Sequence, residues 1–237
     1  MTIKIGKINA SFQEAIKLLK KVELLHSLNY SRKETMNFSK FSEKFVSCMM
    51  EDDYIKIYKT AMKYGDYDIL LNDNSFFQFS ADNKCEIIRY AFYQVPFKGA
   101  TIEDFAKFLG KGRLDSKQLR ELESEQELDY ELFKESAEER HFVTPIRYDY
   151  CPKQHENSIY HPTAHIHIGL EQNLRVPVRR ELTPLLFTAF VVRMMYYKNF
   201  KLNIGNREIE KLMTRREEFK IEDPEFKEEE QKQLYLL

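Results

Sequence analysis

Apolar residues in the first part of the chain recur with the spacing of a helix. After a short strand or extended arm, this spacing predicts a first helix over about residues 12–28, with Ser11 and Glu14 at the separation of a capping box. A second helical pattern begins near Ser39. The apolar positions that carry the two patterns are Phe12, Ile16, Leu19, Val22, Leu25, Phe41, Phe45, Val46 and Met49.

From Asp66 the pattern changes from helical spacing to alternation. Apolar residues at 67, 69 and 71 and aromatic residues at 76, 77 and 79 lie on either side of an Asn-Asp-Asn turn, which indicates two strands. Residues 86–97 are rich in β-branched and aromatic side chains, and the run reaches its end at Pro96. This run predicts a third strand, antiparallel to the second.

Helical signals then interrupt the strands. Thr101 and Asp104 begin a short helix that Gly110 and Gly112 end. Residues 116–139 follow as a strongly acidic helical segment, which we interpret as a solvated helix packed along one edge. The alternative is an acidic surface that mimics nucleic acid or binds a basic partner.

Alternation returns in the second half of the chain. It predicts strands at 141–150 and 164–168, and residues 174–178 complete a hairpin with the latter. Thr183 and Pro184 are a strong helix start, and the nearly all-apolar helix that follows is expected to cover the sheet. A charged amphipathic helix begins at Asn206 and is expected to end near Pro224.

These elements predict an α+β fold, with an antiparallel sheet of about five or six strands flanked by N-terminal and C-terminal helices. We expect one domain over residues 1–237. It comprises an N-terminal helical part (1–65), an α+β core (66–200) with an acidic helical insertion at 100–140, and a C-terminal helix and tail (206–237).

Composition narrows the classes of function. A formal net charge of −1 provides no overall field that would recruit nucleic acid or an anionic membrane, so any basic site is local. Three cysteines without close metal-type spacing favour a reducing compartment. No stretch approaches the length of a membrane span. We therefore expect a cytoplasmic protein without a membrane partner.

Candidate chemistry is concentrated in residues 144–184, which hold four of the six histidines. Side chains two positions apart share a face of a strand. Arg147 and Asp149 are therefore expected on one face of their strand, and His165 and His167 on one face of theirs. If both strands turn their apolar faces inward, the two pairs meet on one polar surface, with loop residues above it.

Two chemical interpretations of this stretch remain open, beside a purely structural one. In the first, His165, His167 and Asp149 bind a divalent metal ion such as zinc or manganese. In the second no metal is bound, and the histidines transfer protons while arginines hold a phosphate. In the structural interpretation, the histidines satisfy hydrogen bonds and Arg147 forms an ion pair with Asp149.

The order of these residues resembles an uncharacterised prokaryotic family, a domain of unknown function, with the pattern RxDYxP, HPxxHxHI, RVP and LTPxxF over residues 147–187. More distantly, the chain is similar to the TumE-like toxins of toxin–antitoxin modules, which carry an Arg-aromatic-Asp strand followed by a histidine-rich segment. This chain has Thr163 and Ala164 where those toxins have an adjacent histidine pair, and it is longer. The resemblance implies a nucleic-acid-directed or defence-related role.

We therefore predict a toxin-like or phage-defence effector, a nuclease that cleaves RNA or DNA. Whether it uses a divalent metal ion stays open. Its partners would be a nucleic acid and a protein such as an antitoxin or a defence ATPase. The alternative is a non-catalytic subunit of a defence or regulatory complex. The expected catalytic residues are His165, His167, Asp149, Arg147 and His161, and the expected substrate contacts are Arg175, Arg179, His155 and Tyr148.

Overall fold

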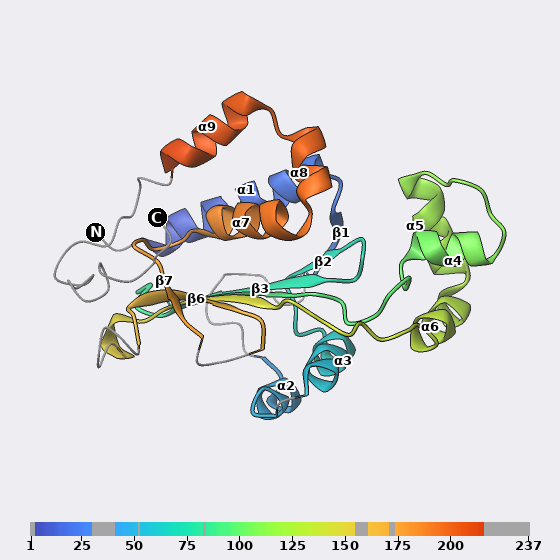
Figure 1. Ribbon diagram of the computed structural model, residues 1–237, viewed down its shortest axis with the longest axis horizontal. Coiled ribbons are helices and arrows are strands. Elements are labelled where there is room, and N and C mark those ends of the chain that lie inside the picture. The colour runs from blue at the N-terminus through green and yellow to red at the C-terminus, as the bar shows by residue number, and fades with distance from the viewer. Residues whose placement is uncertain are drawn as a thin grey trace.

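A seven-stranded antiparallel sheet, in which each strand pairs with the next one along the chain, organises the structure (Figure 1). The computed structural model describes residues 3–29, 41–51, 53–82, 84–154, 161–170 and 174–215. The predicted α+β class with an antiparallel sheet is confirmed. The strands are β1 (Leu25–Leu28), β2 (Ile69–Leu71), β3 (Phe76–Ala81), β4 (Ile88–Tyr93), β5 (Ile146–Tyr150), β6 (Ala164–Ile168) and β7 (Val176–Pro177).

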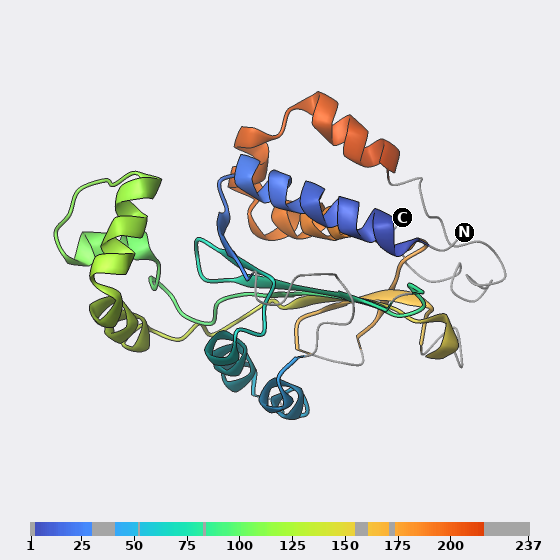
Figure 2. The ribbon, with the colours of Figure 1, turned by 180° about the vertical axis from the view of Figure 1, so that it is seen from behind.

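Two helices pack side by side over one face of the sheet (Figures 1 and 2). They are α1 (Ile5–Lys21) and α7 (Pro184–Met195), and the main core lies between them and the strands. Thr183 caps α7 by accepting a hydrogen bond from the Leu186 amide at 3.3 Å, as the sequence predicted. Helices α8 (Tyr197–Asn203) and α9 (Asn206–Arg215) follow, and α9 lies farther from the sheet.

Among the described residues, two short helices cover part of the opposite face of the sheet (Figure 1). Helices α2 (Glu43–Cys48) and α3 (Tyr54–Tyr64) lie against it (Figure 1). A second apolar core forms there with side chains from β2, β3 and β4, among them Leu70, Phe76 and Tyr93. On this face the side chains change from apolar in β2 to polar and charged in β5 and polar in β6. The candidate chemistry lies in the polar part.

The insertion between β4 and β5 forms a small helical unit that stands apart from the sheet (Figure 2). It contains α4 (Ile102–Phe108), α5 (Ser116–Glu125) and α6 (Glu127–Glu135) around a core that includes Phe105 and Tyr130. The predicted start at Thr101 and Asp104 is confirmed by a complete capping box. The acidic segment is two helices instead of one, because the backbone leaves helical geometry at Gln126, with ψ of 37°.

The first predicted helix was placed too late in the chain. Helix α1 begins at Ile5, and residues 25–28 form the edge strand β1, which pairs with β2. Ser11 is not a capping residue. It is buried inside α1, where its hydroxyl accepts a hydrogen bond from the Leu185 amide of α7 at 3.0 Å. A contact with a distant helix, which local spacing does not reveal, therefore explains the serine.

Two further boundaries differ from the predictions. Strand β5 begins at Ile146, so the expected strand at 141–150 was too long by its first five residues. The expected strand at 174–178 is reduced to the two residues of β7. The predicted helix start near Ser39 and the tail beyond Arg215 lie outside the described residues.

Two tyrosines form a matched pair in the main core. Tyr90 of β4 and Tyr148 of β5 are directly paired across the strands, and both are fully buried. The hydroxyl of Tyr148 donates to the Arg180 carbonyl at 3.2 Å and accepts from the Leu182 amide at 3.0 Å. The hydroxyl of Tyr90 has no hydrogen-bond partner within the described part of the chain. Tyr148 therefore fixes the segment that leads into α7.

Replacing these tyrosines by phenylalanine is expected to have opposite consequences. Tyr148→Phe leaves a buried amide and a buried carbonyl without their partner, and should lower the free energy of unfolding by about 1–3 kcal/mol. Tyr90→Phe removes a hydroxyl that has no partner, and should be neutral or slightly stabilising. Urea unfolding followed by circular dichroism measures both. Equal destabilisation by the two variants would contradict the assigned role of Tyr148.

Candidate functional site

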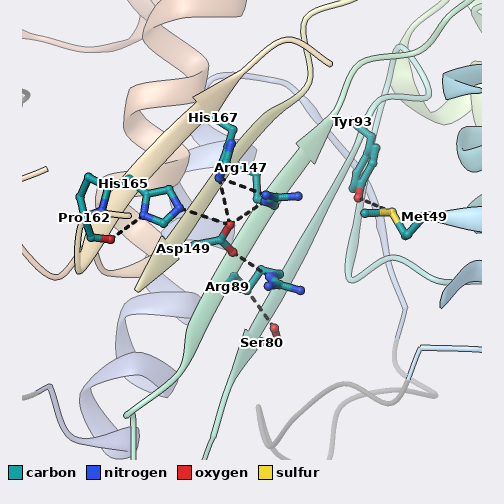
Figure 3. Close-up of polar contacts among 9 residues, drawn as sticks. All are labelled: Met49, Ser80, Arg89, Tyr93, Arg147, Asp149, Pro162, His165 and His167. Carbon is teal, nitrogen blue, oxygen red and sulfur yellow. Dashed lines mark hydrogen bonds and ion pairs between the residues drawn. The ribbon is translucent and has the colours of Figure 1, made fainter. Parts of the chain in front are cut away.

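Polar side chains form a row from β3 to β6 on the face of the sheet that carries α2 and α3. Ser80, Arg89, Asp149 and His165 are successive cross-strand partners from β3 to β6, and Arg147 pairs with His167 one step along (Figure 3). Partners directly opposite in an antiparallel sheet share a face. The prediction that the Arg147–Asp149 pair and the two strand histidines face the same side is therefore confirmed.

Asp149 lies at the centre of this cluster, which comprises Arg89, Arg147, Asp149, His165 and His167. Arg89 donates from Nε to Oδ1 of Asp149 at 2.7 Å, and Arg147 donates from Nε to Oδ2 at 2.7 Å. The Nε2 atoms of His167 and His165 lie 3.4 Å and 4.0 Å from Oδ2 (Figure 3). One carboxylate thus connects three neighbouring strands.

Asp149 is ionised despite its burial. Burial alone would raise the pKa of its carboxyl group, because a buried charge loses its hydration. Hydrogen bonding with His167 and the positive charges of Arg147 and Arg89 outweigh this effect and hold the pKa well below its usual range. Asp149 therefore presents a negative charge between the two guanidinium groups.

His165 is held as a neutral base with a defined tautomer. Burial lowers the pKa of His165 to about 4. Its Nδ1 lies 2.8 Å from the Pro162 carbonyl, which can only accept, so the ring proton is on Nδ1. Nε2 then carries a lone pair that faces the carboxylate of Asp149, another acceptor, at 4.0 Å. This arrangement favours an electrophile between the two atoms.

His167 lies between two different partners. Its Nε2 is 3.0 Å from Nη2 of Arg147, which can only donate, and 3.4 Å from Oδ2 of Asp149, which can only accept. The ring therefore accepts from Arg147 in one tautomer and donates to Asp149 in the other. Its Nδ1 is buried and has no hydrogen-bond partner within the described ranges. The described residues therefore satisfy only part of the hydrogen-bonding capacity of this ring.

Exposure increases from the histidines to the arginines. The side chains of His165 and His167 are 3% and 5% exposed, Asp149 is 12%, Arg147 is 24% and Arg89 is 56%. Two guanidinium groups against one carboxylate leave an excess of positive charge at the rim. Guanidinium groups bind phosphate and carboxylate through paired hydrogen bonds, so the rim is suited to an anion.

The inner atoms of the cluster fit a divalent metal ion. One ligand atom each from Asp149, His165 and His167 lies within 4.8 Å of the other two. Ligand atoms around a tetrahedral zinc ion lie about 3.4 Å apart, so small shifts would complete the geometry. The hydrogen bond from His165 Nδ1 to a backbone carbonyl is the outer contact that typically orients a metal-binding imidazole.

The other residues predicted for the site are distributed less closely. The ring of His161 contacts His165 edge to face, with centroids 5.1 Å apart. Arg175 and Arg179 are half-buried, one on each side of β7. Tyr148 is on the opposite face of the sheet, fully buried under the segment before α7, and is not brought to the cluster. His155 lies outside the described residues.

Arg89 belongs to the cluster but was not among the predicted site residues. It is the one charged residue of β4, whose other five residues are apolar or aromatic. That exception in an otherwise apolar strand was the signal in the sequence. The pairing of β4 with β5, which places Arg89 opposite Asp149, was needed to interpret it.

Three further findings bear on the class of protein. No helix among the described residues is long and apolar enough to cross a membrane. Cys48, Cys85 and Cys151 are buried and free of disulfide bonds. Searches among curated proteins and among solved structures returned no match. Residues 19–237 match the family described as an uncharacterized conserved protein, DUF2290, and the chain belongs to this family.

Proposed function

We propose that this protein cleaves phosphodiester bonds in RNA or DNA, with a divalent cation held by Asp149, His165 and His167. The observation that carries the proposal is the gradient of exposure in the cluster, in which a buried triangle of metal-type ligand atoms adjoins two more exposed guanidinium groups. The buried ligand atoms suit a cation and the guanidinium groups suit the anion that this cation would activate.

Each residue of the cluster has a definite role in this proposal. Arg89 and Arg147 hold the phosphate and neutralise charge that develops on it during cleavage. Asp149 and the two strand histidines fix the cation, and His161 positions the ring of His165 by edge-to-face contact. A divalent cation in such a site would polarise a phosphoryl oxygen and lower the pKa of a bound water, so that loss of a proton to solvent near neutral pH would give a hydroxide able to attack phosphorus.

We propose nucleic acid as the substrate, and a toxin or phage-defence role, because residues 147–168 resemble TumE-like toxins. The charge distribution agrees with it. A protein of net charge −1 attracts a polyanion only through a local basic site, and the rim formed by Arg89 and Arg147 is such a site.

Removing the inner ligands is expected to abolish both cation binding and cleavage. Asp149→Asn and the double variant His165→Ala/His167→Ala should lose stoichiometric zinc or manganese and should cleave labelled RNA and DNA at least a hundredfold more slowly. Metal content is measured by mass spectrometry after reconstitution. The matched control is His26→Ala/His141→Ala, which removes two histidines that are not part of the cluster and should leave both properties unchanged.

The outcomes separate the parts of the proposal. Undiminished cleavage by the double histidine variant, with its circular dichroism spectrum intact, would rule out the cluster as the catalytic site. Undiminished toxicity of that variant without any cleavage of nucleic acid would rule out the nuclease. Cleavage that continues in a chelator, by protein without bound metal, would reject the cation and leave the acid–base interpretation of the same residues.

Arg147 and a bound cation are expected to compete, because Arg147 contacts Oδ2 of Asp149 and Nε2 of His167, two of the candidate ligand atoms. Arg147→Met should therefore tighten manganese binding severalfold while it weakens binding of an oligonucleotide. Arg89→Met is the matched control, since Arg89 contacts only Oδ1. Arg89→Met should weaken oligonucleotide binding and leave manganese binding unchanged. Isothermal titration of each ligand measures both effects, and weaker manganese binding by Arg147→Met would contradict the shared position.

A second candidate function is a non-catalytic subunit of a defence or regulatory complex, with a protein partner such as an antitoxin or an ATPase. The observation that favours it is a set of exposed apolar side chains on and beside the acidic insertion: Phe108, Leu128, Leu132 and Phe142. Exposed apolar groups that cluster on a surface often mark a protein interface.

Replacement of the insertion's apolar side chains discriminates between the two functions. If the protein is a non-catalytic subunit, Leu128→Ser/Leu132→Ser should abolish its effect in cells, while the double histidine variant should retain that effect. If it is a nuclease, purified Leu128→Ser/Leu132→Ser should cleave nucleic acid at the rate of the unmodified protein, because these leucines lie outside the cluster. Growth of expressing cells and cleavage of labelled RNA are the two measurements.

A further inference from the structure

A cavity of about 80 Å³ adjoins the cluster on its apolar side. It lies between the helical pair α2 and α3 and the strands β4, β5 and β6. Its lining includes Met49, Tyr54, Ile57 and Tyr93 on the apolar side and Arg147 and His167 on the polar side. The same guanidinium and imidazole therefore belong both to the cluster and to the wall of this cavity.

The aromatic part of the cavity is rigid. The ring of Tyr93 is nearly parallel to those of Tyr54 and Phe76, with interplanar angles of 22° and centroid distances of 6.3 Å and 4.8 Å. The Tyr54 hydroxyl donates to the Gln94 carbonyl at 2.5 Å, and the Tyr93 hydroxyl donates to the Met49 sulfur at 3.4 Å (Figure 3). With both hydroxyls engaged, the aromatic rings contribute mainly apolar surface.

Arg147 connects the two environments. Its guanidinium group bonds to Asp149 and His167 on the cluster side and lines the cavity as well. A phosphate held by Arg147 would therefore lie at the mouth of the cavity. A group attached a few bonds away from that phosphate would enter the apolar, aromatic part of the cavity.

The size of the cavity limits what that group is. A single buried water needs about 10–15 Å³ of such space, so 80 Å³ corresponds to about five to eight water-sized positions. A six-membered ring with small substituents matches this volume better than a fused two-ring system does. Aromatic side chains beside a phosphate-binding arginine are how proteins hold an unpaired nucleobase.

We propose that this cavity receives a pyrimidine base of a single-stranded nucleic acid whose phosphate is held by Arg147, so that the protein prefers to act beside a pyrimidine. The proposal rests on the proposed function of the cluster and adds its substrate class. Single-stranded substrate is required, because a paired base cannot leave its stack to enter a side pocket without an energetic cost.

Binding of small ligands tests the cavity separately from cleavage. Cytidine 5′-monophosphate should bind at least tenfold more tightly than ribose 5-phosphate, and adenosine 5′-monophosphate should bind more weakly than the cytidine compound, by isothermal titration. Ile57→Phe fills the cavity from α3, where Ile57 is only partly buried. It should reduce cytidine 5′-monophosphate binding to the level of ribose 5-phosphate. Ile55→Phe, on the same helix but outside the cavity, should change neither affinity.

Several results would overturn the proposal. Equal binding of nucleotide and sugar phosphate by the unmodified protein would mean that the cavity does not hold a base, as expected if an apolar peptide side chain occupies it. Tighter binding of adenosine 5′-monophosphate than of cytidine 5′-monophosphate would reject a pyrimidine as the occupant of the cavity. If cytidine discrimination is present but RNA and DNA remain uncleaved, the base pocket stands and the proposed nuclease fails. If the protein cleaves nucleic acid but does not discriminate between bases, the proposed nuclease stands and the base pocket fails.

Discussion

The ion pairs that Asp149 forms with Arg89 and Arg147 are the constraint on which the polar half of the structure depends. A buried carboxylate is stable only when ion pairs and hydrogen bonds replace its lost hydration. Here Arg89 and Arg147 supply them from the neighbouring strand and from its own strand, at 2.7 Å each. A shift of one residue in the pairing of β4 with β5 would move Arg89 to the apolar face. The charge therefore specifies the register that brings Arg89 to the face of Asp149.

One face of the sheet carries the main core, and the other face carries the candidate site. Helices α1 and α7 seal one face with an aromatic core around Phe77, Phe79 and Phe187. Because this core is large, the other face can carry polar side chains on β5 and β6. Helices α2 and α3 cover β2 to β4 on that side and bring an apolar cavity to the border of the cluster. The proposed cation, phosphate and base would then lie in one continuous line across the border.

Alternation was sufficient to predict which residues of a strand share a face, because that geometry is local. It placed Arg147 with Asp149 and His165 with His167 correctly. It did not reveal Arg89, whose significance depends on the strand that pairs with β4, nor β1, whose Leu25 and Leu28 also fit a helix. Ser11 was misread for the same reason, since its partner Leu185 lies far away in the chain. Pairing between distant segments is the information that one sequence does not contain.

The proline of β7 determines where the sheet stops. Val178 donates its amide to Ala164 of β6, so the nitrogen of Pro177, one residue earlier, turns to the outer edge. Proline has no amide hydrogen, and an edge that lacks this donor is a poor template for another strand. The edge beside His165 is thereby protected against pairing with a second protein chain. Strand β6 can thus lie next to the edge strand without that edge becoming a site of aggregation.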